Sequence, residues 1–223
     1  MDIKDLLKSS WIDFKVTLLG FIKLAWWPLL VLVAIPNVSF YMEVNESSWT
    51  AVFLDFIESI ATVFLALYSF SSLFKSRDIE ISITSGKVFI LWFTSVFIAV
   101  ASSIATLFLV IPGLIILALS IFVPIFILYK NEGPIEAIAF SSSYMQDQTV
   151  RLTVVFTVLW GIPLIVDYVL LYFPLNSICL EIASVLLAAI CGYFIYSVAF
   201  NAYFELKKIH DNSMQSRVET AAD

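Results

Sequence analysis

The feature that most constrains this chain is a long stretch without a charged residue, residues 88–129. An α-helix rises about 1.5 Å per residue, so about 20 apolar residues cross the hydrocarbon core of a bilayer. The stretch is about twice as long as one such span, and Ile111-Pro112-Gly113 interrupts it with a turn signal. We expect two spans joined by a tight hairpin; a re-entrant break is the competing interpretation.

The composition extends this interpretation to the whole chain. Of the 223 residues, 61% are hydrophobic and 13% are charged, and the mean hydropathy is +0.98. A soluble domain carries about 25% charged residues, and one soluble core of this size cannot hide so many apolar side chains. Backbone groups in lipid must pair within the protein, and apolar runs of about 20 residues favour helices over barrel strands.

The apolar runs therefore predict an all-α, polytopic transmembrane helix bundle with about six spans. Its transmembrane domain covers residues 24–205, and a polar tail that we expect to be frayed covers residues 206–223. A short helix is expected to begin at Pro134, between the fourth and fifth spans. The spans are expected at residues 24–42, 50–74, 87–110, 114–129, 150–173 and 180–204.

An amphipathic helix precedes the first span, in residues 1–23. Leu7, Trp11 and Phe14 recur at spacings of three and four, and charged residues fall largely away from that stripe. The pattern is typical of a helix lying in the membrane interface. A helix packed on the cytoplasmic side of the bundle fits the pattern equally well.

The basic residues indicate the orientation in the membrane. With six spans, all twelve fall on one side, which the positive-inside rule makes cytoplasmic. Both termini are then cytoplasmic, and the chain is expected in a bacterial inner membrane. The basic residues are Lys4, Lys8, Lys15, Lys23, Lys75, Arg77, Lys87, Lys130, Arg151, Lys207, Lys208 and Arg217.

Acidic residues on the opposite side provide the candidate site. Asp55 and Glu58 are three residues apart, so they share a helix face. Asp167 lies deeper in its span, and ionisable groups within spans are costly and often functional. The three carboxylates predict a cation or proton site, or else hydrated groups near the outer headgroups. The face of Asp55 and Glu58 continues through Ser59, Thr62, Ala66 and Ser69.

Motifs of enzymes and metal sites are not found. The sequence has no Gly-rich phosphate loop, no H-E-x-x-H and no G-x-S-x-G. The only histidine lies in the tail, so Ser141, Ser142 and Ser143 have no base and are expected at a cytoplasmic helix start or on a helix surface. Cys179 and Cys191 are expected to be small buried residues. We expect a non-enzymatic protein with no cofactor, no metal and no nucleic-acid partner.

Spaced Pro and Gly residues in residues 83–152 carry a resemblance to a known family. The pattern is a long span, an [IV]-P-G-[IL] turn, a short span with Pro, and then G-P-x-E-A-x-x-x-S. It resembles the YciC-like family of bacterial inner-membrane proteins, and is similar to the membrane domain attached to some glycerophosphodiester phosphodiesterases. The matching residues are Ile111, Pro112, Gly113, Leu114, Pro124, Gly133, Pro134, Glu136, Ala137 and Ser141.

The resemblance implies a six-helix inner-membrane protein and brings no catalytic residues with it. Three functions remain open from the sequence. The first is a membrane module in envelope or lipid homeostasis, with lipids as partners. The second is a small cation-coupled transporter or channel that uses the three carboxylates. The third is an interaction subunit, such as an assembly factor or immunity protein, which contacts other membrane proteins or a second copy of itself.

Overall fold

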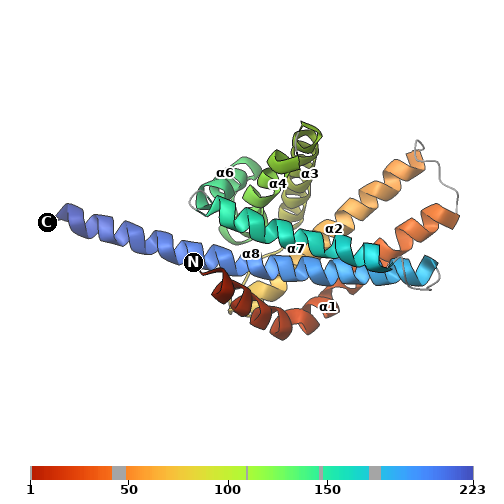
Figure 1. Cartoon of the computed structure of the whole chain (residues 1–223), viewed down its shortest axis with the longest axis horizontal. Helices are drawn as coiled ribbons and strands as arrows, with labels where there is room; N and C mark the ends of the chain where they lie inside the picture. Colours follow the sequence, from red (N-terminus) through yellow and green to blue (C-terminus); the bar gives the residue numbers. More distant parts are fainter. Residues whose placement is uncertain (1, 42–48, 109, 146–147, 171–176, 223) are drawn as a thin grey trace.

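The computed structural model describes residues 2–41, 49–108, 110–145, 148–170 and 177–222 (Figure 1). Every regular element within these ranges is a helix, which confirms the all-α prediction. The helices are α1 (Ile3–Tyr41), α2 (Trp49–Lys75), α3 (Ser85–Phe108), α4 (Val110–Leu119), α5 (Val123–Ile125), the π-helical turn η1 (Phe126–Lys130), α6 (Pro134–Met145), α7 (Thr149–Leu170) and α8 (Ser177–Ala222).

The lengths and hydropathies of these helices make the chain a helical membrane protein. Within the described residues, five segments are long and apolar enough to cross a bilayer. A shorter apolar segment, Thr149–Ile162, belongs to α7, where we expected the fifth span. The five long segments are Ile3–Ile35, Trp49–Lys75, Ser85–Leu107, Pro112–Lys130 and Ile182–Asp211.

The N-terminal amphipathic helix and the first span are one continuous helix, α1, where we expected two elements. No helix-breaking signal separates them, and Pro28 lies in the interior of α1, where it removes one backbone hydrogen bond and permits a bend. The first half of α1 packs on α8, with Leu6, Phe14 and Phe21 buried. We expected this helix either to lie in the membrane interface or to pack on the bundle. The buried face shows that one side of it packs on the bundle.

The α3–α4 reversal lies just before the Pro-Gly pair. Residue 109 lies outside the described residues, and Pro112 and Gly113 belong to the first turns of α4, where Pro is tolerated. Gly113 is buried against α3, and the Ser102 hydroxyl donates to its carbonyl at 3.0 Å. A Cβ atom at Gly113 would overlap the Thr106 hydroxyl and approach the Ser102 carbonyl to 3.0 Å. The glycine therefore permits the close approach of the two helices.

The expected fourth span is broken after Leu119. Ser141 of α6 satisfies backbone groups at the break: its hydroxyl donates to the Leu119 carbonyl and accepts from Phe122 N–H at 3.3 Å. Ser141 is fully buried, so the expectation of a surface position for it was wrong. The short helix α5 and the π-helical turn η1 follow the break. The residue after η1 is Asn131, a residue type that tolerates the left-handed conformation found there, with φ 59°.

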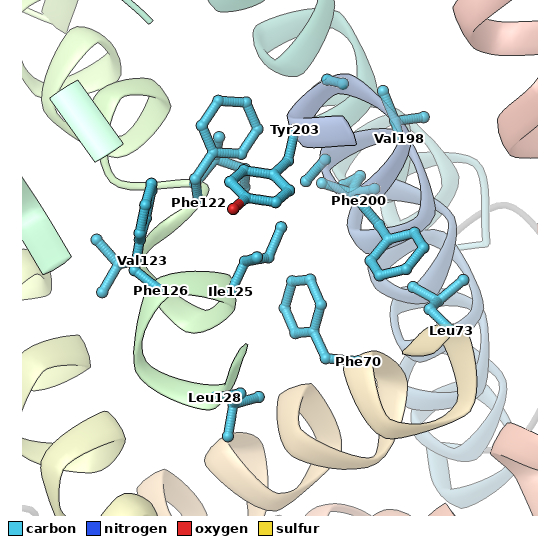
Figure 2. Close-up of a cluster of buried hydrophobic side chains, with 14 of the residues drawn as sticks. Phe70, Leu73, Phe122, Val123, Ile125, Phe126, Leu128, Val198, Phe200 and Tyr203 are labelled. Carbon is cyan, nitrogen blue, oxygen red and sulfur yellow. The ribbon is translucent and has the colours of Figure 1, made fainter. Parts of the chain in front are cut away.

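The main core lies where α2, the broken segment and α8 meet. Figure 2 shows Phe70 of α2, Phe126 of η1 and Tyr203 of α8 among the side chains that converge there. All three are less than 5% exposed. Aromatic rings supply much of the contact, as in the edge-to-face pair of Phe126 and Tyr203, whose ring centres are 5.5 Å apart.

A polar network beside this core joins α1, α8 and the turn after α2. The guanidinium of Arg77 donates to Asn201 Oδ1 at 2.6 Å and lies 3.5 Å from Asp13 Oδ2. Asn201 in turn donates to Asp13 Oδ2 at 2.9 Å. We call this part of the bundle, which includes Arg77, Lys130 and Lys207, the basic end.

The last helix, α8, extends well beyond the basic end (Figure 1). It continues as one helix through the segment where we expected a frayed tail. Its sequence after the last span contains Glu205, Lys207 and Lys208, all residue types that favour helix. Cys179, near its start, is exposed, which corrects the expectation that both cysteines are buried.

Candidate functional site

Asp55 and Glu58 lie on one face of α2, as their spacing predicts, and that face lines a cavity of about 490 Å³. The cavity lies where α3 crosses α2, and Tyr196 of α8 also contributes to it. Asp55 is exposed and Glu58 is half-buried. The lining residues are Asp55, Glu58, Ser59, Thr62, Val63, Ala66, Trp92, Ser95, Val96, Ala99 and Tyr196.

Trp92 of α3 contacts α2 where the two helices cross. Its indole N–H donates to Ser59 Oγ at 2.9 Å, and its ring meets Phe56 edge-to-face at 5.4 Å between ring centres. Away from the crossing, the α3–α4 pair stands apart from α1 and α2 (Figure 1). The cavity therefore lies between α2 and α3, next to their crossing, where the two helices begin to diverge.

The free polar groups of the cavity are mostly hydrogen-bond acceptors. The Ser59 hydroxyl donates to the Phe56 carbonyl at 2.8 Å, and the Thr62 hydroxyl donates to the Glu58 carbonyl at 3.0 Å. The Trp92 N–H is likewise engaged with Ser59. The carboxylates of Asp55 and Glu58 and the remaining lone pairs of the Ser59 and Thr62 hydroxyls are left to accept, while the hydroxyls of Ser95 and Tyr196 can both donate and accept. Such a lining suits a ligand that donates hydrogen bonds.

The charge of the cavity is not neutralised by the protein residues described around it. Among the residues that the structure describes, the one carboxylate in an ion pair with a Lys or Arg is Asp13, far along the chain from the cavity. No Lys or Arg belongs to the lining. Two carboxylates without a protein counter-charge attract a cation, most strongly where surrounding apolar side chains lower the local dielectric constant.

Asp167, the third predicted acidic residue, lies on α7. Its side chain is outside the described part of the structure, and α7 contributes none of the described lining residues. The structure thus brings Asp55 and Glu58 together in one cavity and leaves the participation of Asp167 a prediction. Ser69, which we placed on the same face of α2, is buried in the bundle and donates to the Leu65 carbonyl at 2.7 Å.

Sequence reasoning missed the part of the lining that comes from α3 and α8. Trp92, Ser95 and Ala99 are spaced three and four residues apart and so share one face of α3, which a helical wheel can show. Nothing in their spacing says that this face meets α2. Tyr196 gives no local signal, because it reaches the cavity only through the packing of α8.

The residues of the family pattern have structural positions away from this cavity. Gly113 lies in the α3–α4 contact, while Pro112 beside it is exposed. Pro124 is the second residue of the short helix α5. Pro134 is the first residue of α6, and the carboxylate of Glu136 lies over Gly133, the residue before that helix.

Comparison of the chain with protein-family models, with curated proteins and with solved structures finds no match.

Proposed function

We propose that this chain is a non-enzymatic membrane protein that binds the positively charged head of an amphiphile in the α2–α3 cavity. One observation carries the proposal: the free polar groups of the cavity are mostly acceptors, and two of them are carboxylates without a basic partner in the lining. A protonated amine supplies both the hydrogen-bond donors and the charge that this lining accepts.

The rest of the lining supports an amphiphile rather than a wholly polar ligand. Val63, Ala66, Val96 and Ala99 form an apolar wall beside the carboxylates. The volume of about 490 Å³ is within the range of small-molecule sites. An alkyl chain attached to the amine can pass between α2 and α3 into the surrounding lipid, because side chains such as Phe53 and Phe97 are exposed there.

A bare cation is the second candidate ligand, and it would make the chain a cation-coupled transporter or channel. The two carboxylates in one cavity favour this candidate. A dehydrated Ca²⁺ takes about 6–8 oxygen ligands, and the described residues include no group of three or more His, Cys, Asp or Glu that could hold a metal ion. An organic ammonium group makes fewer demands on the number of ligands, so we favour it.

The biological setting that we propose is lipid or envelope homeostasis in a bacterial inner membrane, with both termini in the cytoplasm. The distribution of the twelve basic residues under the positive-inside rule supports that orientation. The resemblance of residues 83–152 to the YciC-like family supports the setting. In this orientation the Asp55 end of α2 faces away from the cytoplasm.

Fluorescence of Trp92 in reconstituted protein tests the proposed ligand. The protein is placed in nanodiscs of a zwitterionic lipid, and doxyl-labelled stearylamine or doxyl-labelled stearyl alcohol is added. The Trp92 signal is the difference between the wild type and W92F. We expect the amine to quench Trp92 at an amount about tenfold lower than the alcohol, a ratio that corresponds to about 1.4 kcal/mol.

Two variants test whether the carboxylates cause the preference for the amine over the alcohol. Replacing Asp55→Asn and Glu58→Gln together should remove the preference for the amine, whereas Asp5→Asn, a matched change of an exposed carboxylate on α1, should leave it unchanged. Equal quenching by the amine and the alcohol in the wild type would refute the proposal. Ion flux in proteoliposomes that falls in D55N, E58Q or D167N would support the transporter instead.

A further inference from the structure

A second, smaller crevice lies between α1, α7 and α8, on the side of α8 that receives the first half of α1. It has a volume of about 140 Å³, and the described residues that line it all carry apolar side chains. The residues that surround it are Trp11 and Phe14 of α1, Leu159 and Ile162 of α7, and Ile190, Cys191, Phe194 and Ile195 of α8. The α2–α3 cavity shares none of these residues, so an inference drawn here does not rest on the proposed function.

The crevice has a rigid aromatic wall and an open, lipid-facing side. Trp11 stacks on Phe14 with 5.3 Å between ring centres, and both rings meet Phe194 edge-to-face. Trp11 is 49% exposed, and Ile162 and Ile190 are 39% and 38% exposed. An apolar cavity of about 150 Å³ holds a molecule the size of benzene, so this crevice has room for a short segment of an alkyl chain.

One lysine contacts the Trp11 wall of the crevice, and a second precedes Trp11 on the same side of α1. The Lys15 ammonium lies 5.5 Å from the centre of the Trp11 ring. Lys8 precedes Trp11 by three residues, so it shares that side of α1. Both lysines are exposed, and within the described ranges neither forms an ion pair. Asp13, the nearest acidic residue in sequence to Lys15, is engaged with Arg77 and Asn201.

We infer that this crevice is a binding site for an anionic phospholipid of the leaflet at the basic end. One acyl chain lies in the crevice against Trp11 and Phe194, and the phosphate lies at Lys15 and Lys8. Charge complementarity selects the headgroup, because Lys15 and Lys8 form no ion pair within the described ranges and none of the described lining residues carries a carboxylate. The indole of Trp11, with its polar N–H, is suited to the boundary between headgroups and chains.

Brominated lipids test the inference directly. Wild-type protein is reconstituted in nanodiscs of phosphatidylcholine that contain a small fraction of phosphatidylglycerol or phosphatidylcholine with brominated acyl chains. The Trp11 signal is the difference between the wild type and W11F. We expect brominated phosphatidylglycerol to quench Trp11 as strongly as an about 25-fold higher mole fraction of brominated phosphatidylcholine, since each of the two lysines contributes about fivefold to anionic-lipid binding.

Two matched pairs of variants separate the headgroup from the chain. Lys8→Gln with Lys15→Gln should lower quenching by phosphatidylglycerol to the level of phosphatidylcholine, whereas Lys23→Gln, two turns further along α1, should not. Cys191→Phe fills the crevice and should reduce quenching by both lipids, whereas Cys179→Phe, at an exposed position, should not. Equal quenching by the two lipids in the wild type overturns the inference, even if a variant fails to fold.

Discussion

The two halves of α2 lie in opposite surroundings. Every buried residue of this helix lies at Ala61 or later in the sequence. Before that point, large apolar side chains such as Phe53 and Phe56 are 60% and 45% exposed. One helix thus belongs at its basic end to a close-packed core and at its other end to a surface that meets lipid.

The comparison teaches which parts of the molecule are shaped by packing and which are open to ligands. An apolar side chain exposed to lipid is already in an apolar solvent, so burying it against another helix gains no hydrophobic free energy. Association of helices in lipid therefore depends on close packing and hydrogen bonds. The aromatic core and the Arg77 network supply both at the basic end. The α2–α3 crossing has the Trp92 contacts and otherwise encloses a cavity.

The largest expected effect contrasts a phenylalanine from each region. Phe200 is fully buried against Phe74 and Phe204, whereas Phe53 of α2 is 60% exposed. We expect Phe200→Ala to lower the free energy of unfolding by about 3–5 kcal/mol, because it leaves a cavity in a packed core. Phe53→Ala should change it by less than about 0.5 kcal/mol. Equilibrium unfolding in mixed detergent micelles measures both, and similar losses would contradict the contrast.

An intermediate effect is expected at Gly113, where α3 and α4 approach each other closely. Gly113→Ala places a methyl group against the Thr106 hydroxyl and the Ser102 carbonyl. We expect a loss of about 1–3 kcal/mol, typical of overpacking. The same unfolding experiment measures it.

Two further variants identify steric overlap as the cause of that loss. Combining Gly113→Ala with Thr106→Ala should recover part of the stability, because the overlapping hydroxyl is gone. Gly161→Ala is the matched control: a Cβ there meets nothing within 4 Å, so it should be neutral or gain up to about 1 kcal/mol from helix propensity. A loss at Gly161 as large as that at Gly113 would refute the steric explanation.

The sequence predicts the helices well where a local signal decides them. The apolar runs give the all-α class and the approximate position of α2, because a helix in lipid satisfies its own backbone. The break after Leu119 has no such signal. It depends on Ser141, which comes from α6, so it follows only from the tertiary packing of that helix. The continuity of α1 could be anticipated only in part, because Pro28 is compatible with both a break and a bend.

In the candidate site, too, some features follow from local sequence signals and others from tertiary packing. The spacing of Asp55 and Glu58 predicts their common face, since residues three apart are neighbours on a helix. The contribution of Trp92 and Tyr196 depends on how α3 and α8 cross α2, which no local pattern specifies. The lysines of the first half of α1 were predicted to lie on the cytoplasmic side of the membrane, but the crevice beside them forms only when α7 and α8 pack against Trp11.

The smallest expected effect concerns Arg77, which joins three segments of the basic end. Its guanidinium is about one-third exposed, donates to Asn201 and lies 4.8 Å and 4.6 Å from the ring centres of Phe200 and Phe204. Solvent screens its pairing with Asp13, so we expect Arg77→Ala to cost only about 1 kcal/mol. Arg77→Lys should recover little of this stability, because an ammonium lacks the planar group that donates to Asn201 and stacks on the two rings at the same time.

Lys75→Ala, a substitution of an exposed neighbour, is the control and should leave the free energy of unfolding unchanged. The loss should persist at high salt, because stacking and the Asn201 bond are not ion pairs; a loss that disappears in salt would show that Asp13 alone holds this arginine in place.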